Sequence, residues 1–433
     1  MERNHTFYRA TGSFKTAAGP LISVLTAFLL YASAAQAQIK FPDGSMQTTA
    51  FGGTNNVASG TDATVGGGLD NVASGDQSTI SGGSTNAADG EASTIGGGFG
   101  NQALHIDTTV GGGSLNIAGA AKAVVSGGTL NTASGVSSVV AGGEDNIASA
   151  QNAVVGGGLL NETNNLNGTI AGGAMNLSSG DSSTIAGGYF NDANDLDATV
   201  GGGSENVASG LASTIPGGSQ NIAAGDLSFA TGFGATVEAA HNGTTLFADS
   251  RVFFFFSDRA NEFAARATGG VRFVTAISGV TGEPLNGVRL SPGGGTWLNL
   301  SDKNSKENVR PVDTEAALEE VLALPINTWN YKTQDPTVRH MGPMAQDFYA
   351  AFGLGTDERH IGTVDADGAA LAAIQGLHQR MVRQNETLFE ELARKNSDIA
   401  ALRHENALLS ARLDSLEALI LEATHTSGTS SEN

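Results

Sequence analysis

The sequence contains no cysteine and few aromatic residues, which make up 6% of its 433 residues. The lack of cysteine excludes a disulfide framework and a cysteine-ligated metal site. Basic residues are also scarce: 22 Lys and Arg stand against 43 Asp and Glu, and the formal net charge is −21. The chain therefore lacks the basic patch of a nucleic-acid-binding protein, whereas a self-repelling acidic surface suits a soluble exported protein. Its stability is expected to come from repeats, from oligomerisation or from both.

Glycine, by contrast, is abundant, with 60 residues. It is concentrated before residue 235 in a periodic pattern, which argues against low-complexity disorder. Asn recurs with a constant spacing of 15 residues, a Gly-Gly pair precedes it from Gly67-Gly68 onward, and a β-branched residue stands two positions before each pair. A small residue, usually Ala, lies two positions after the Asn. The Asn positions are 56, 71, 86, 101, 116, 131, 146, 161, 176, 191, 206 and 221.

A fixed period without drift indicates one structural unit per repeat, stacked along an axis. A repeat of 15 residues with several Gly is too short for two helices but suffices for two short strands and two turns. Equivalent residues then stack in columns about 4.8 Å apart. Val and Ile columns are expected to fill a thin core, Gly-Gly to allow a tight turn, and the Asn column to hydrogen-bond the turn backbone. The pattern predicts a β-solenoid over 52–235.

The repeat resembles the left-handed β-roll heads of trimeric autotransporter adhesins, the YadA-like heads, over about 52–235. Their unit is a comparable phrase in which Gly-Gly is followed by Asn and then by Ala. The resemblance implies a homotrimer. The repeat differs from the calcium-binding nonapeptide repeat, which needs Asp at a nine-residue spacing. Its Gly triplets are not phosphate loops, because no Lys follows them.

Residues 1–37 have the pattern of a secretory signal peptide. Basic residues precede an apolar run from Leu21 to Ala32, and Ala35-Gln36-Ala37 supplies a cleavage site of the A-x-A type. The alternative, a membrane anchor, needs an apolar run of roughly 20 residues. The mature chain is expected to begin at Gln38 and to contain no membrane span.

Two segments flank the repeats. Residues 38–51 contain a Pro-Asp-Gly turn and are predicted to form a hairpin that caps the first coil. Residues 236–300 are predicted to be a β connector that includes four consecutive Phe, Phe253 to Phe256. Four adjacent Phe cannot all face the interior of a lone strand, so this segment is expected to lie where three chains meet. The alternative is a strand buried inside one subunit.

From residue 301 onward the sequence is of ordinary α+β type. Asp313 is expected to cap a helix that Pro325 ends, and a second helix is expected over 345–352. Residues 371–423 carry sustained heptads, which predict a parallel coiled coil, and the polar residues 424–433 are expected to be a disordered tail. The a positions are Leu371, His378, Asn385, Leu392, Ile399, Asn406, Leu413 and Ile420, and the d positions are Ile374, Met381, Leu388, Lys395, Leu402, Leu409 and Leu416.

Ser301 and Lys306 lie at the border between the two kinds of sequence. A neutral Lys can take the proton from a Ser hydroxyl, which is the Ser-Lys form of nucleophile activation. By itself, such a spacing usually reflects two solvated surface residues. The flanking motifs are what single this pair out.

The stretch resembles the start of the endosialidase-type intramolecular chaperone domain, a self-cleaving C-terminal domain of phage tail spikes and related fibres. The resemblance covers about 301–390, and the domain itself is predicted at 301–370. It begins with Ser301-Asp302, Lys306 and Asn308-Val309. The later motifs are Leu322 to Tyr331, His340 to Asp347, and Asp365 to Leu377.

This second resemblance implies a homotrimer that cuts itself just before the Ser, between Leu300 and Ser301. Ser301 is then the nucleophile and Lys306 the base, with Asp302 and Asn308 in supporting roles. Lys306 must be neutral to accept a proton, so it is expected to lie desolvated at the trimer interface. One departure is Asn304-Ser305, where many members carry an Arg, and it bears on the rate of cleavage.

The sequence thus predicts a mainly β chain with an α+β C-terminal part: a homotrimeric β-roll of 15-residue repeats, a β connector, a chaperone domain and a coiled coil. The expected function is that of an exported fibre or adhesin-like protein, secreted or on the outer surface of a Gram-negative-type bacterium. Its partners are copies of itself and an unknown surface or host ligand, with no nucleic acid, cofactor or metal. A prophage tail fibre, an uncleaved surface stalk and a glycan hydrolase are the alternatives.

Overall fold

The computed structural model describes residues 39–40, 46–47 and 53–428. The predicted signal peptide at 1–37 lies outside the described residues. Of the predicted cap hairpin at 38–51, the structure describes two short strands, β1 (Ile39–Lys40) and β2 (Met46–Gln47), which pair antiparallel as a hairpin requires.

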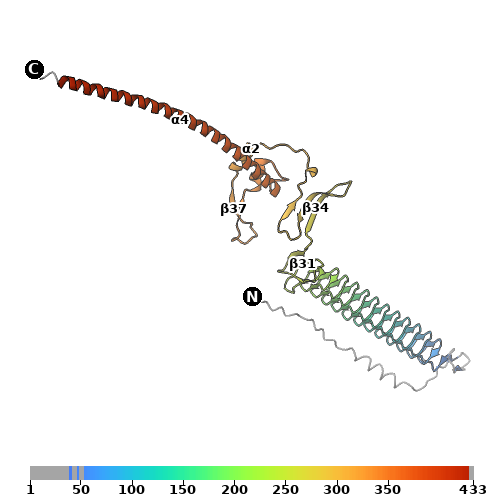
Figure 1. Cartoon of the computed structure of the whole chain (residues 1–433). Coiled ribbons are helices and arrows are strands. Elements are labelled where there is room, and N and C mark those ends of the chain that lie inside the picture. Colours follow the sequence, from blue (N-terminus) through green and yellow to red (C-terminus); the bar gives the residue numbers. More distant parts are fainter. Residues whose placement is uncertain (1–38, 41–45, 48–52, 429–433) are drawn as a thin grey trace. The chain divides into compact units, whose positions relative to one another are not determined.

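The first of two compact units, residues 1–271, contains a parallel β-solenoid of short strands stacked coil upon coil (Figure 1). Before β28 (Ile222–Ala223), each strand of the two sheets pairs with the strand 15 residues further on, as Thr94 does with Thr109, and in the last coils the offset varies, as from Phe229 to Thr245. One sheet, here called the alanine sheet, contains β4 (Val57–Ala58), β7 (Val72–Ala73), β9 (Ala87–Ala88), β11 (Gln102–Ala103), β13 (Ile117–Ala118), β15 (Thr132–Ala133), β17 (Ile147–Ala148), β19 (Glu162–Thr163), β21 (Leu177–Ser178), β23 (Asp192–Ala193), β25 (Val207–Ala208), β28 (Ile222–Ala223), β30 (Ala235–Val237) and β32 (Phe255–Phe256).

A second sheet, here called the valine–isoleucine sheet, forms the other side of each coil. Its strands are β5 (Thr64–Val65), β8 (Thr79–Ile80), β10 (Thr94–Ile95), β12 (Thr109–Val110), β14 (Val124–Val125), β16 (Val139–Val140), β18 (Val154–Val155), β20 (Thr169–Ile170), β22 (Thr184–Ile185), β24 (Thr199–Val200), β26 (Thr214–Ile215), β29 (Phe229–Phe233), β31 (Thr245–Ala248) and β33 (Phe263–Arg266). The short strand pairs β3 (Gly53–Thr54) with β6 (Gly68–Leu69), and β27 (Gly218–Ser219) with β29, lie off these two rows. The predicted mainly β solenoid of 15-residue coils is confirmed.

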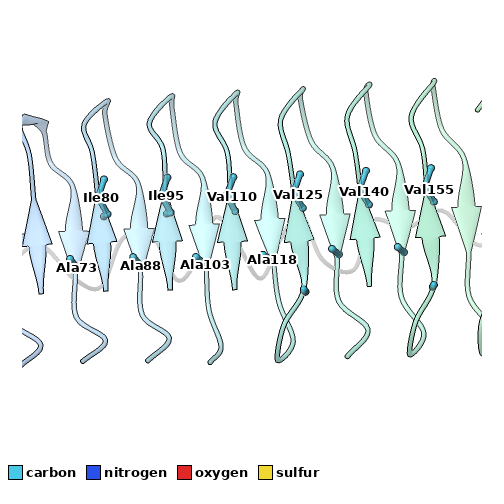
Figure 2. Close-up of a cluster of buried hydrophobic side chains, with 14 residues drawn as sticks. Ala73, Ile80, Ala88, Ile95, Ala103, Val110, Ala118, Val125, Val140 and Val155 are labelled. Atoms are coloured by element: carbon cyan, nitrogen blue, oxygen red, sulfur yellow. The ribbon is translucent and has the colours of Figure 1, made fainter. Parts of the chain in front are cut away.

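The core of the solenoid is a thin layer between the two sheets. Alternate residues of a strand point to opposite sides. In each two-residue strand the second residue points inward and the first points outward. Ile80, Val110 and Ala88 are 0% exposed, and Figure 2 shows the Val and Ile side chains rising from one set of strands while the Ala side chains mark the other. Burial of each Val or Ile contributes about 1.5–3 kcal/mol. The predicted core columns are confirmed.

The Asn column is buried and bonded from coil to coil, as the sequence predicts. Asn131 is typical and is 0% exposed. Its backbone N–H donates to Asn116 Oδ1 at 3.0 Å, and its Nδ2 donates to the carbonyls of Gly127 and Gly143, each at 2.9 Å. Its Oδ1 accepts from the backbone N–H of Asn146 at 3.0 Å. Each side chain therefore ties three successive coils together.

In the Gly127-Gly128 pair, only the second glycine is required by the backbone. Gly128 has φ of 88°, and a Cβ there would lie 2.2 Å from the carbonyl oxygen of Gly143 in the next coil. A Cβ on Gly127 would meet nothing within 4 Å. The pair is thus one obligatory glycine beside one permissive position.

Replacing Gly128 by Ala is expected to destabilise the solenoid by at least about 2 kcal/mol, because it adds backbone strain and a clash with the next coil. Gly127→Ala, the same change one residue earlier, is expected to alter stability by less than about 0.5 kcal/mol. Urea unfolding followed by circular dichroism in the strand region measures both. Equal losses in the two variants would show that the close approach at Gly128 is not what selects glycine.

The solenoid extends past the predicted border at residue 235. Strands β29 to β33 add further coils that lack the Asn but continue the core with Val237 and Leu246, both 0% exposed. The sequence places the border too early because parallel strand pairing depends on the inward apolar residues, which continue past residue 235. The Asn and Gly-Gly signature, on which the prediction relies, ends earlier. Arg266 ends this stack, where its guanidinium donates to the carbonyls of Phe233 at 3.2 Å and Arg251 at 3.0 Å.

An ion pair supports this end of the solenoid. Arg266 Nε lies 2.8 Å from Asp249 Oδ1. The hydroxyl and backbone N–H of Thr268 donate to Asp249, and these bonds, with Arg266, hold the pKa of that carboxyl well below its usual range. At this end of the stack the Asp249 carboxylate and the carbonyls of Phe233 and Arg251 are thus satisfied by neighbouring donors.

The Phe run is not buried inside the single chain. Phe255 packs against the core, but Phe253 is 72% exposed, Phe254 48% and Phe256 52%. The alternative of a strand buried inside one subunit is therefore wrong. Exposed aromatic groups of this size point to a partner surface.

The second compact unit, residues 272–433, begins with a small sheet of β34 (Val271–Ile277), β35 (Pro284–Leu290) and β36 (Trp297–Asn299), shown in Figure 1. Its apolar residues lie open on both faces of the sheet, since Phe273 and Trp297 stack on one face and Leu298 lies on the other, all more than half exposed. Exposed apolar side chains on a sheet of this kind mark an interaction surface.

The remaining elements are helical with one hairpin. They are η1 (Lys303–Ser305), α2 (Thr314–Ala323), β37 (Asn327–Trp329), β38 (His340–Gly342), α3 (Ala345–Phe352) and α4 (Thr363–Gly428). Asp313 caps α2 as predicted, because its carboxylate accepts from the backbone N–H groups of Glu315 and Ala316. No helix among the described residues is long and apolar enough to cross a membrane.

Helix α4 corrects two predicted boundaries. It begins at Thr363, eight residues before the predicted coiled coil, and it runs on to Gly428, into the segment predicted to be a disordered tail at 424–433. No Gly or Pro interrupts residues 377–427, so nothing in the backbone ends the helix earlier. Residues 429–433 lie outside the described part.

Candidate self-cleavage site

Ser301 and Lys306 are in direct contact. The Nζ atom of Lys306 donates to Ser301 Oγ at 2.6 Å. Ser301 follows immediately after Leu300, whose backbone N–H donates to the carbonyl of Gly287 at 3.2 Å. The Leu300–Ser301 peptide bond therefore lies at the end of the β34–β36 sheet, with one side anchored to it.

The turn that brings Lys306 back to Ser301 is built by η1. Asp302 caps it, with its carboxylate accepting from the backbone N–H of Asn304 at 2.8 Å. The hydroxyl of Ser305 closes the turn by donating to the carbonyl of Asp302 at 2.8 Å. Asp302 thus positions the turn, and its hydrogen bonds are with Asn304 and Ser305 rather than with Ser301 or Lys306.

Asn308 has a structural place as well. Its φ is 56°, in the left-handed region that Asn tolerates better than most residues. It redirects the chain just after the turn and makes no contact with the Ser301–Lys306 pair that the structure records. Of the four predicted site residues, the structure therefore brings two together and places the other two in the backbone that holds them.

Both Ser301 and Lys306 are exposed in the single chain. A Lys amine accepts a proton from a hydroxyl only when it is neutral, and removal from water favours that neutral form. The pair has the contact needed for nucleophile activation but not yet the dry surroundings. The described part of the same chain does not shield Lys306 from water, so the shielding that would favour its neutral form has to come from elsewhere.

Helix α2 packs on α4, as Figure 1 shows, and the contact depends on a close backbone approach. A Cβ on Gly376 of α4 would lie 2.0 Å from the carbonyl oxygen of Thr314 in α2. Around this point Arg383 pairs with Glu315 at 2.6 Å, and Arg380 pairs with Glu319. Sequence reasoning missed these residues, and an isolated Gly within the helical pattern was their one available signal.

The α2 contact leaves the heptad seam of α4 open. Gly376, Arg380 and Arg383 are neither a nor d positions, whereas Leu371 is 63% exposed and Leu388 is 61% exposed. A long helix with an exposed apolar a/d seam is typical of one helix of a coiled coil in the absence of the other helices. The two surfaces of α4 therefore serve different contacts.

The comparisons with known proteins agree with this division of the chain. Residues 301–353 match the family model described as "Chaperone of endosialidase", and the match starts at Ser301. No curated protein matches the chain significantly. The match supports the chaperone domain predicted for the C-terminal part, and the solenoid before it fits a repeat head, for which the YadA-like kinship remains a resemblance.

Proposed function

We propose that this protein is an exported trimeric fibre or adhesin-type protein whose C-terminal chaperone domain aligns three chains and then cuts itself off at Leu300–Ser301. The observation that carries the proposal is the 2.6 Å contact between Lys306 Nζ and Ser301 Oγ at the first residues of the chaperone match. A slow and error-prone parallel β assembly benefits from a template that sets the register first. Loss of the template afterwards makes the product kinetically stable.

The cleavage itself is a transfer of the Leu300 acyl group. Lys306 takes the hydroxyl proton while Ser301 Oγ attacks the carbonyl carbon of Leu300. The C–N bond then breaks, the nitrogen of Ser301 receives the proton as a new amino terminus, and Leu300 is held as an ester on Oγ. Water hydrolyses the ester, so one water is consumed, and the products are a Leu300 carboxylate and a free Ser301.

Assembly switches the reaction on. In the single chain the site is exposed, and so are both faces of the adjoining β34–β36 sheet. Neighbouring chains that cover this sheet also withdraw water from Lys306, which favours its neutral form. Unassembled chains are therefore expected to remain uncut.

The trimer is supported by the open seam of α4, by the exposed Phe run and by the family of the chaperone domain. The full-length Ser301→Ala protein is expected to be a trimer in solution, because folding does not need the cut. Light scattering at micromolar concentration measures its mass. A monomer under these conditions would contradict the assembly of three chains.

A prophage tail fibre or spike with the same chaperone is the second candidate, and the family description of the C-terminal domain favours it. Both candidates share the trimer and the cut, but they differ in export. An exported protein is expected to lose residues 1–37 and begin at Gln38. N-terminal sequencing of protein from the cell envelope decides between them, since a retained Met1 argues for the tail fibre.

A further inference from the structure

One outward face of the solenoid carries no charged residue. This uncharged face is the outer side of the valine–isoleucine sheet over residues 64–216. Two columns of outward-pointing residues make up this face. The first column holds the first residue of each strand: Thr64, Thr79, Thr94, Thr109, Val124, Val139, Val154, Thr169, Thr184, Thr199 and Thr214. The second column holds the residue that directly follows each strand, which is small or, once, a proline: Gly66, Ser81, Gly96, Gly111, Ser126, Ala141, Gly156, Ala171, Ala186, Gly201 and Pro216.

The acidic residues of the same coils lie elsewhere. Asp89, Glu162 and Asp192 lie on the outer side of the alanine sheet, Glu144 lies in the row of isolated parallel bridges that includes Thr129 and Leu159, and the others lie in the turns of the coils. Burial already raises the pKa of the Asp192 carboxyl in the single chain. A further chain laid on that side would remove more water from these carboxylates at a cost in free energy, whereas the uncharged face carries no such penalty.

The uncharged face runs directly into a ladder of exposed aromatic rings. Thr214 pairs in register with Phe229 on the next strand of the same sheet. The ring of Phe229 lies 5.5 Å from that of Phe247, which lies 5.7 Å from that of Phe263. Phe263 is 72% exposed and Phe247 is 40% exposed. Apolar surface of this kind marks an interaction site, and it is continuous with the uncharged face.

We propose that the uncharged face, with its Phe ladder, is the surface through which the solenoids of three copies of this chain pack around a common axis. The inference rests on the proposed trimer and adds to it which side of the head faces the partners. Chains of net charge −21 repel one another, so close approach favours the side without acidic groups. Small side chains also let the three backbones come near, and a parallel coiled coil brings identical coils to the same height.

Single cysteines test the orientation without background, because the chain has none of its own. Val139→Cys places a thiol on the uncharged face, and Ile147→Cys places one on the alanine sheet. Both positions are β-branched, half-buried and outward-facing, on neighbouring strands. Thr199→Cys and Val207→Cys form a second matched pair in another coil. All four are made in the full-length Ser301→Ala chain, treated with a short thiol-to-thiol crosslinker and run on a denaturing gel.

The uncharged-face cysteines are expected to yield at least about fivefold more covalent dimer than their alanine-sheet partners, because crosslinking requires the two sulfurs to come close. Light scattering on the same samples separates this inference from the proposed function. A trimer in which the alanine-sheet cysteines crosslink equally or better overturns the assigned face and leaves the trimer standing. A trimer in which no pair crosslinks also overturns it. A monomer overturns both.

Discussion

Replacing Lys306 by Arg is expected to leave the chain uncut. The guanidinium remains protonated and can still donate to Ser301 Oγ, but it cannot accept the hydroxyl proton. Loss of a general base slows such reactions by about 100- to 10,000-fold. Cleavage is followed on a denaturing gel as the purified chain separates into two pieces.

Lys303→Arg is the matched control for this change. Lys303 lies in the same turn, and its backbone carbonyl accepts from the N–H of Lys306 at 3.3 Å, but no side-chain contact to Ser301 is recorded. The control is expected to cleave at close to the wild-type rate and the Lys306→Ala chain to stay whole. If Lys306→Arg were cut as fast as the control, Lys306 would not be the base, even with the fold correct.

Breaking the seam of α4 is expected to abolish both assembly and cleavage. Leu402 and Leu409 are successive d positions, 59% and 54% exposed in the single chain. Burying each Leu contributes about 1.5–3 kcal/mol per chain, and an Asp at each position replaces that gain with buried charge. Leu402→Asp with Leu409→Asp is therefore expected to give a monomer that is not cut.

Ala400→Asp with Ala407→Asp adds the same charge to the same turns of α4, at positions outside the seam. This control is expected to remain a trimer and to cleave normally. Light scattering of each protein in the Ser301→Ala background gives the mass, and the gel of the Ser301 form gives the cut. Normal cleavage by a monomeric seam variant would show that the site needs no partner chain.

Most of the solenoid could be predicted from the sequence because each coil repeats the same inward residues. The 15-residue period of Asn predicts the hydrogen bonds from coil to coil. The β-branched residue before each Gly-Gly pair predicts the side chains of the core. The coils after residue 235 were missed because they keep the inward residues, such as Leu246, without the polar signature. The end of α4 was also missed, since polar composition after Ala423 says little about where a helix ends.

At the site, the contact between Ser301 and Lys306 follows from their spacing and from the family-like motifs. The sequence could not predict the cap made by Asp302 or the left-handed backbone of Asn308, and the supporting roles of these two residues stay a prediction. The docking of α2 at Gly376 could not be predicted, because it depends on two helices meeting in space. The catalytic roles of Ser301 and Lys306 stay a prediction until cleavage is measured.

Intact-mass measurement of the purified wild-type protein under denaturing conditions tests the central claim most directly. We expect two species, one ending at Leu300 and one beginning at Ser301, while the Ser301→Ala protein gives a single uncut chain. A wild-type chain that stays whole as a trimer, or one cut at any other bond, would contradict self-cleavage at Leu300–Ser301.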